Sequence, residues 1–375
     1  MNLKERLDKQ LEARKQNQSY RTLTLSENLI DFISNDYLGL ARSPELAYLI
    51  NSQNERTHKN GSTGSRLLSG NSALTESTEA QLCKIFASEG SLIFNSGYSA
   101  NLAVLSSIPQ RGDTIIYDEL AHASIKDGIR LSLAKRLSFR HNNLKDLEQK
   151  IISAEGNVFI AVESAYSMDG DFCPLQELVQ LSQKYDSHII LDEAHTTGLI
   201  GASGGGLAVK LGLEKDVLVR IYTFGKAMGI HGACVACDNY LKEYLINFAR
   251  PFIYTTALSP HSILSISNAF SYLEKHESLQ RRIEDQVKLF NKLFTNKIGD
   301  QLKRPACDHP IQAIIIPGND QVKAAARHLQ LSGYDVRPIL SPTVKVGEER
   351  LRICLHTFNS DDDISGLINS LANLI

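Results

Sequence analysis

The sequence predicts an α/β protein with a mainly parallel sheet, helices on both faces of that sheet, and a smaller α+β domain after it. In the middle of the 375-residue chain, short apolar runs alternate with longer helical patterns. Several runs are apolar on consecutive residues, as a sheet buried on both faces requires. After about residue 280 the pattern of strands and helices changes, which indicates a second domain.

The first predicted element is an amphipathic N-terminal helix with Leu3, Leu7 and Leu11 on one side. A helix at Leu175–Lys184 is predicted between two strands, which is the order of a parallel sheet. The strands predicted in this central part are Ser91–Phe94, Thr114–Tyr117, Val158–Val162, His188–Leu191, Leu218–Tyr222 and Ala233–Ala236. The C-terminal part is predicted to contain strands Ile311–Ile316, Asp335–Ile339 and Leu351–Leu355 and helices Val322–Leu331 and Asp361–Leu374.

From these patterns we expect three regions. An N-terminal helix and strand segment covers residues 1–45, a large ligand-binding domain covers 46–275, and a small α+β domain covers 276–375. A chain of this length can bury a large core without disulfides or metal ions.

Charge and hydropathy exclude several classes of partner. The net charge of −2 gives no reason to expect a nucleic acid. The longest uncharged stretch, Ser91–Gln110, contains asparagine, glycine and proline, so we expect a strand, a turn and a helix there and no membrane span. The N-terminus lacks the apolar core of a signal peptide.

The 6 cysteines are scattered, and Cys234 and Cys237 are the one closely spaced pair. On a strand, positions i and i+3 face opposite sides, so this pair is poorly placed to hold a metal ion. We expect no metal site, buried thiols and a reducing cytosol.

An apolar strand ends in Asp192, with Glu193, Ala194 and His195 after it. Ligands of open α/β sheets bind outside the carboxyl ends of strands, where a carboxylate can pair with a cationic group. The alternative is an ordinary capping aspartate. The letters DEAH also occur in nucleic-acid helicases, but the phosphate loop that a helicase needs is missing from the sequence.

Lys226 follows the predicted strand Leu218–Tyr222 among apolar residues and glycines. Desolvation lowers the pKa of a lysine and makes its amine a nucleophile for Schiff-base chemistry. The alternative is a lysine whose amine reaches the surface.

Three further segments could take part in chemistry. His122 follows the strand Thr114–Tyr117 and could stack on a flat cofactor, or it could be a hydrogen-bonded core histidine. The turn Asn95–Asn101 lies between a strand and a helix, and free N–H groups at a helix start bind anions. Gly201–Gly205 matches the G-x-S-x-G pattern of hydrolases, but no clear strand precedes it.

These segments place four groups at strand ends of one sheet: a lysine, an acid, a histidine and an anion-binding turn. A pyridoxal phosphate enzyme needs these groups. At these residues the sequence resembles the α-oxoamine synthases, pyridoxal phosphate enzymes of fold type I. The resemblance rests on motifs along nearly the whole chain, some of which contain these residues: Ser34–Leu40, Gly64–Gly70, Asp118–Ser124, Glu163–Gly170, Asp192–His195, Thr223–Lys226 and Arg350–Ile353.

The resemblance implies a mainly parallel seven-stranded sheet and a set of cofactor contacts. Lys226 would bind the cofactor covalently and act as general base, Asp192 would pair with the ring nitrogen, and His122 would stack on the ring. The remaining implied cofactor contacts are His195 and Ser167 near the phenolic oxygen, Gly97, Tyr98 and Thr223 at the phosphate, and Thr255 and Thr256.

The motifs Asp192–Gly198, Thr223–Ala227 and Phe248–Thr256 are most similar to those of members that condense L-alanine with a pimeloyl thioester in biotin synthesis. The resemblance then assigns the amino-acid carboxylate to Asn35 and Arg352. It assigns the far carboxylate of the acyl group to Arg21, with Thr343 near that channel. It also implies a homodimer in which Asn35, Thr255 and Thr256 complete the partner's site.

Two positions depart from the family pattern: Thr75 stands where many members have histidine, and His231 stands where several have a small residue. Family members that use other amino acids and thioesters share the cofactor residues, so these residues do not separate them. A non-catalytic phosphate- or nucleotide-binding module is the alternative from another class.

Overall fold

The computed structural model describes residues 1–23, 25, 28–54, 59–305 and 307–374. The chain forms two compact units. The larger unit contains residues 35–167 and 172–281, and the smaller unit contains residues 1–34, 168–171 and 282–375. The division expected from the sequence, into 1–45, 46–275 and 276–375, stays a prediction. It does not separate the short segment 168–171, which belongs to the smaller unit.

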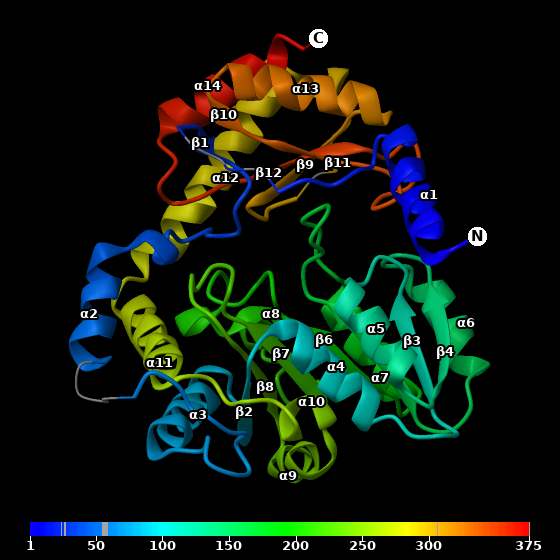
Figure 1. The fold of residues 1–375 in the computed structure, drawn as a ribbon, viewed down its shortest axis with the longest axis vertical. Coiled ribbons are helices and arrows are strands. Elements are labelled where there is room, and N and C mark those ends of the chain that lie inside the picture. The colour runs from blue at the N-terminus through cyan, green and yellow to red at the C-terminus, as the bar shows by residue number, and fades with distance from the viewer. Residues whose placement is uncertain (24, 26–27, 55–58, 306, 375) are drawn as a thin grey trace. The chain divides into compact units, whose positions relative to one another are not determined.

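The larger unit is built on a seven-stranded sheet with the order β2-β8-β7-β6-β5-β3-β4 (Figure 1). The strands β3, β4, β5, β6 and β7 are mutually parallel, whereas β8 runs antiparallel to both β7 and β2. Their bounds are β2 Gly90–Phe94, β3 Thr114–Asp118, β4 Lys135–Phe139, β5 Val158–Glu163, β6 His188–Asp192, β7 Val219–Thr223 and β8 Ala233–Cys237. The predicted fold class is confirmed.

Every residue of β2, β5 and β8 is buried, which explains why these strands are visible as continuous apolar runs. The sequence prediction missed β4, whose residues Lys135 and Arg136 are exposed. This strand pairs with β3 alone at the edge of the sheet, where polar side chains face solvent and protect the free edge from pairing with other chains.

Helices cover both faces of the sheet, and each face has its own apolar core. On one face, α4, α5, α9 and α10 contribute buried residues, and on the other face α6, α7 and α8 do (Figure 1). Their bounds are α4 Gly97–Ser107, α5 Ala123–Leu131, α6 Leu144–Ile152, α7 Leu175–Lys184, α8 Gly206–Leu211, α9 Asn239–Phe248 and α10 Arg250–Ile253.

The helix α11 (Pro260–Lys275) packs against α2 (Pro44–Asn54) and α3 (Ala73–Ile85). Short 3₁₀ turns lie at η1 (Leu40–Arg42) and η2 (Ala202–Gly204).

The smaller unit has a three-stranded antiparallel sheet in the order β11-β12-β9. Its elements are β9 Ile311–Ile315, β11 Arg337–Ile339, β12 Arg350–Cys354, α12 Ser278–Lys297, η3 Gly299–Gln301, α13 Asn319–Leu331 and α14 Asp361–Ala372. The predicted single strand Asp335–Ile339 is wrong in one respect: its start belongs to β10 (Tyr334–Asp335), which pairs in parallel with β1 (Ile30–Asp31), whereas β11 pairs with β12.

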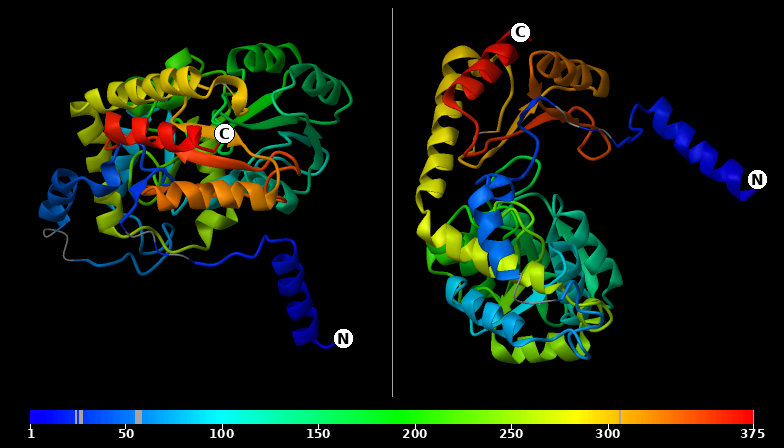
Figure 2. Two further views of the ribbon diagram at one scale, coloured as in Figure 1. Left: turned by 90° about the horizontal axis from the view of Figure 1, so that it is seen from above. Right: turned by 60° about the vertical axis from the view of Figure 1, so that its left-hand side comes forward.

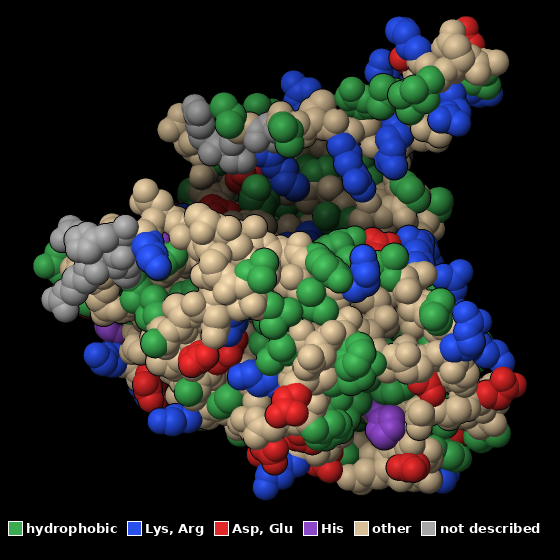
Figure 3. All heavy atoms as spheres, turned by 60° about the horizontal axis from the view of Figure 1, so that its bottom comes forward, with side chains coloured by type: hydrophobic (Ala, Val, Ile, Leu, Met, Phe, Trp, Pro, Cys, Tyr) green, Lys and Arg blue, Asp and Glu red, His purple; other side chains and the backbone are tan. Residues whose placement is uncertain are grey.

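The predicted N-terminal helix is present as α1 (Leu3–Gln16; Figure 2). None of its residues is buried. The side chains of Leu3, Leu7 and Leu11 are all exposed. Basic and acidic side chains are interspersed on the face of the molecule in Figure 3, in keeping with the small net charge. None of the described helices is both long and apolar enough to cross a membrane.

Candidate functional site

A pocket of about 300 Å³ lies at the carboxyl ends of the parallel strands in the larger unit. It brings together most of the predicted cofactor residues of this unit. The predicted residues that line it are Asn35, Gly97, Tyr98, His122, Asp192, Thr223 and Lys226. Lining residues to which the sequence analysis gave no role include Asn101, Ser124 and Glu163.

The first turn of α4 forms an anion cradle at one side of the pocket. Ser96 caps the helix by accepting a hydrogen bond from the Ser99 amide at 3.2 Å, which leaves the Gly97 and Tyr98 amides at the helix start. A Cβ atom on Gly97 would lie 2.2 Å from Thr223 Cγ2, so only glycine fits there. Thr223 Oγ1 is buried and has no hydrogen-bond partner among the described residues. A buried hydroxyl without a hydrogen-bond partner lowers the stability of the fold. A phosphate oxygen in the cradle could accept a hydrogen bond from it.

Asp192 is held in a fixed orientation at the end of β6. Its carboxylate is 4% exposed and accepts hydrogen bonds from Asn101 Nδ2 at 2.7 Å and from the Ala194 amide at 2.8 Å. Asn101, on α4, also donates to Ser124 Oγ at 3.1 Å. A buried carboxylate that faces a pocket favours a cationic partner, such as a protonated pyridine nitrogen.

Glu163 is a second acid in the pocket. It ends β5 directly opposite Asp192 in the strand register, and it is 3% exposed. Its Oε1 accepts a hydrogen bond from the His122 amide at 2.6 Å. Burial, and next the charge of Asp192, raise the pKa of Glu163 to about 8, although Lys226 opposes the shift. The rule that selected Asp192, an acid at the end of an apolar strand, also selects Glu163.

His122 is the N-cap of α5, and its ring is anchored by a 2.7 Å hydrogen bond between Nδ1 and Ser124 Oγ. Desolvation by burial lowers the pKa of the imidazole. The charge of Asp192 raises this pKa, and the charge of Lys226 lowers it. The ring is therefore neutral at pH 7, which suits an aromatic surface beside a flat cofactor better than a cation does.

Lys226 lies in the loop after β7, where it is half-buried and lines the pocket. The loop is fixed by backbone hydrogen bonds from Gly229 to Lys226 at 2.8 Å and from Ile230 to Phe224 at 3.0 Å. Gly229 has a φ of +64°, and a Cβ there would lie 2.2 Å from the Ala41 amide nitrogen. This glycine therefore allows the close approach that holds the lysine loop.

His195 is buried but does not line the pocket. Its Nδ1 lies 2.9 Å from the hydroxyl of Tyr37, and that hydroxyl donates to Asn35 Oδ1 at 3.0 Å. Tyr37 is fully buried, so it connects His195 to a residue of the pocket wall. Tyr37 has no predicted role, although it lies inside Ser34–Leu40, a motif on which the family resemblance rests.

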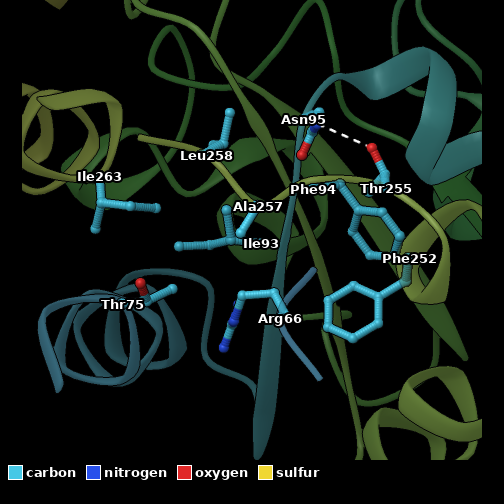
Figure 4. A pocket seen from close by; sticks show the side chains of 10 residues that line it. All are labelled: Arg66, Thr75, Ile93, Phe94, Asn95, Phe252, Thr255, Ala257, Leu258 and Ile263. Carbon is cyan, nitrogen blue, oxygen red and sulfur yellow. Dashed lines mark hydrogen bonds between the residues drawn. The ribbon is translucent and has the colours of Figure 1, made fainter. Parts of the chain in front are cut away.

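Thr255 and Thr256 lie outside the lining of this pocket. Asn95 Nδ2 donates to Thr255 Oγ1 at 3.2 Å and to the Thr256 carbonyl at 3.0 Å, beside a smaller pocket that Arg66 and Thr75 also line (Figure 4). Ser167, the last residue before the segment 168–171, does not line the pocket at the strand ends either.

Three predicted substrate residues belong to the smaller unit. Arg352 lies on β12, is half-buried and donates to Cys354 Sγ at 3.0 Å. Arg21 and Thr343 are exposed. Among the residues that the structure describes, no group of histidine, cysteine, aspartate and glutamate could hold a metal ion, and all 6 cysteines are free thiols.

The chain is similar to known proteins over its whole length. A sequence profile of the aminotransferase class I and II family matches residues 27–371. An 8-amino-7-oxononanoate synthase of Emericella nidulans is 39% identical over 99% of this chain and 95% of its own. The 8-amino-7-oxononanoate synthase of Chlorobaculum parvum is 34% identical and is matched over 100% of both chains.

Two solved structures show the same similarity. Serine palmitoyltransferase of Sphingomonas wittichii has a TM-score of 0.91 at 26% identity, over 100% of this chain and 98% of its own. The 8-amino-7-oxononanoate synthase of Francisella tularensis has a TM-score of 0.80 at 29% identity, over 93% and 98%. The chain therefore belongs to the aminotransferase class I and II family, and within it to the pyridoxal phosphate-dependent, acyl-transferring enzymes of fold type I.

Proposed function

We propose that the protein condenses L-alanine with a pimeloyl thioester to give 8-amino-7-oxononanoate, CO₂ and the free thiol, a step of biotin synthesis. The observation that carries the proposal is the meeting of Lys226, Asp192, His122 and the α4 amides in one pocket. Relatives named 8-amino-7-oxononanoate synthase, at 34% and 39% identity over nearly the full length, support the choice of reaction.

The pocket residues fit pyridoxal phosphate. The amides of Gly97 and Tyr98 and the unpartnered hydroxyl of Thr223 would hold the phosphate, and Asp192 would keep the ring nitrogen protonated. When bound, the cofactor supplies an electron sink that stabilises negative charge on the substrate Cα.

The chain's own residues would position the substrates and move protons. Lys226 Nζ would hold the cofactor in the resting enzyme and take up and return the proton at the substrate Cα. His122 would cover the ring and exclude water from it. Asn35 and Arg352 would bind the amino-acid carboxylate, and His195 and Ser167 would hydrogen-bond near the phenolic oxygen. Arg21, with Thr343 nearby, would bind the far carboxylate of the acyl group.

A homodimer with shared sites is part of the proposal. Thr255 and Thr256 lie outside the pocket of their own chain, which agrees with a role in the partner's site. We also propose a cytosolic location, which the free state of all 6 cysteines supports.

A product assay tests the proposal. Purified enzyme is offered L-alanine, glycine or L-serine with pimeloyl, acetyl, succinyl or palmitoyl thioesters, and the Lys226→Ala variant serves as the inactive control. We expect the highest kcat/KM for L-alanine with the pimeloyl thioester. A clear preference for glycine with acetyl or succinyl thioester, or for serine with palmitoyl thioester, would replace this proposal with a different α-oxoamine synthase.

A further inference from the structure

The pocket of about 300 Å³ that Lys226 and Asp192 line is the catalytic pocket of the proposed reaction. A second pocket, of about 270 Å³, adjoins it within the larger unit. His231 lines both pockets and therefore forms their common wall. The second pocket has an aliphatic side formed by Leu40 of η1, Leu46 and Ile50 of α2, and Ile230 of the lysine loop. Its other lining side chains are mainly polar and include Ser43, Asn51, His261, Ser262 and Ser265. Nothing in the reaction described so far uses this space.

His231 itself is suited to sit on a substrate path. Its side chain is exposed, and within the described part of the chain it makes no hydrogen bond or ion pair. The lysine loop holds its backbone in place, since the neighbouring Ile230 amide donates to the Phe224 carbonyl at 3.0 Å. An imidazole with no partner in the protein is free to contact a ligand in either pocket.

A thioester substrate needs such a second space. Its carbonyl carbon must reach the substrate Cα in the catalytic pocket, whereas the methylene groups beyond that carbonyl are apolar and gain from an apolar wall. The catalytic pocket is lined mainly by residues with polar and charged side chains, and none of its described lining residues is leucine, isoleucine or valine. The second pocket offers an aliphatic side directly beyond His231.

We propose that the second pocket is the subsite for the methylene chain of the acyl group, and that His231 at its entrance determines which acyl chains pass. The proposal rests on the proposed function for the identity of the substrate. It concerns the methylene groups between the thioester carbonyl and the far carboxylate, and the variants that test it do not change Arg21.

Direct binding tests the proposal without requiring turnover. The probes are non-reactive pantetheine analogues in which a methylene replaces the thioester sulfur, with a pimelyl or an acetyl group. Their affinities for the holoenzyme are measured by calorimetry. Burying a methylene group is worth about fourfold in affinity, so the pimelyl probe should bind the wild type at least about tenfold more tightly than the acetyl probe.

Ala47→Phe fills the second pocket from α2, because Ala47 lines it and is exposed. We expect this variant to weaken the pimelyl probe by about tenfold or more and to leave the acetyl probe unchanged. His231→Ser should alter the affinity ratio of the two probes. The controls are Tyr48→Ala, on the same helix but outside the pocket, and His188→Ala, at the opposite end of β6 from Asp192.

Equal binding of the two probes by the wild type, or an unchanged ratio in both Ala47→Phe and His231→Ser, would overturn the proposal. If the probes behave as expected and the product assay yields no 8-amino-7-oxononanoate, the acyl subsite stands and the proposed reaction is wrong.

Discussion

Replacing Glu163 by glutamine should change how the stability of the protein depends on pH. The Glu163 carboxyl is almost fully buried beside Asp192, and its pKa is raised from 4.5 to about 8. It is therefore protonated at neutral pH in the folded protein and ionised in the unfolded chain. Glutamine keeps the shape of the protonated acid and can still accept the hydrogen bond from the His122 amide.

Proton linkage determines the sign and the size of this change in stability. Between pH 4.5 and 8 Glu163 binds close to one proton more in the folded than in the unfolded state, so its contribution to the free energy of unfolding falls as the pH rises. The slope is about 1.4 kcal/mol per pH unit, and at pH 7 the loss relative to strongly acidic solution is about 3 kcal/mol. Glu163→Gln removes this contribution, so its advantage over the wild type should grow by about 2.5 kcal/mol from pH 5 to pH 7.

Chemical unfolding of wild type and Glu163→Gln at pH 5, 6 and 7 measures this difference. Glu274→Gln, on an exposed part of α11, controls for the general effect of removing an acid. The measurement uses the apoenzyme, because a bound cofactor would change both the burial of Glu163 and the charges around it. Parallel pH profiles of wild type and variant would refute the raised pKa.

Three further predictions address the cofactor and substrate residues. Asp192→Asn should still bind the cofactor, judged by its visible absorbance, but should lose roughly tenfold to a hundredfold or more in kcat, because the ring nitrogen loses its charged partner; normal turnover would exclude the pairing. Arg21→Ala should lower kcat/KM for the pimeloyl thioester by roughly tenfold to a hundredfold and spare L-alanine binding in a spectral titration. Light scattering of active enzyme should give twice the 41.5 kDa chain mass, and a monomer with full activity would contradict shared sites.

The central sheet could be predicted because its strands are buried on both faces. Burial forces consecutive apolar residues, and the strand ends then locate Asp192 and Lys226 at one edge. The edge strand β4 could not be found in this way, since Lys135 and Arg136 face solvent. The division of Asp335–Ile339 between β10 and β11 could not be predicted either. β10 pairs with β1 and β11 pairs with β12, and the sequence does not show that neighbouring residues pair with different strands.

Side-chain partners were harder to predict than strand positions. Tyr37 and His195 are 158 positions apart in the chain, and a hydrogen bond at that separation leaves no local pattern. Likewise the apolar side of α1 was visible from the spacing of Leu3, Leu7 and Leu11, yet these leucines are exposed. Periodicity shows which side of a helix is apolar, but it does not identify what packs there.

Three acids at the ends of β5 and β6 show why residue type alone does not assign a role. Asp192 and Glu193 are adjacent and both buried, but only Asp192 lines the pocket. The Glu193 carboxylate instead accepts hydrogen bonds from the Leu207 and Ala208 amides, both at 2.9 Å, at the start of α8. Glu193 is thus a structural cap. Glu163 holds the His122 amide as a largely protonated acid at neutral pH, so Asp192 is the carboxylate best placed to pair with a cationic cofactor ring.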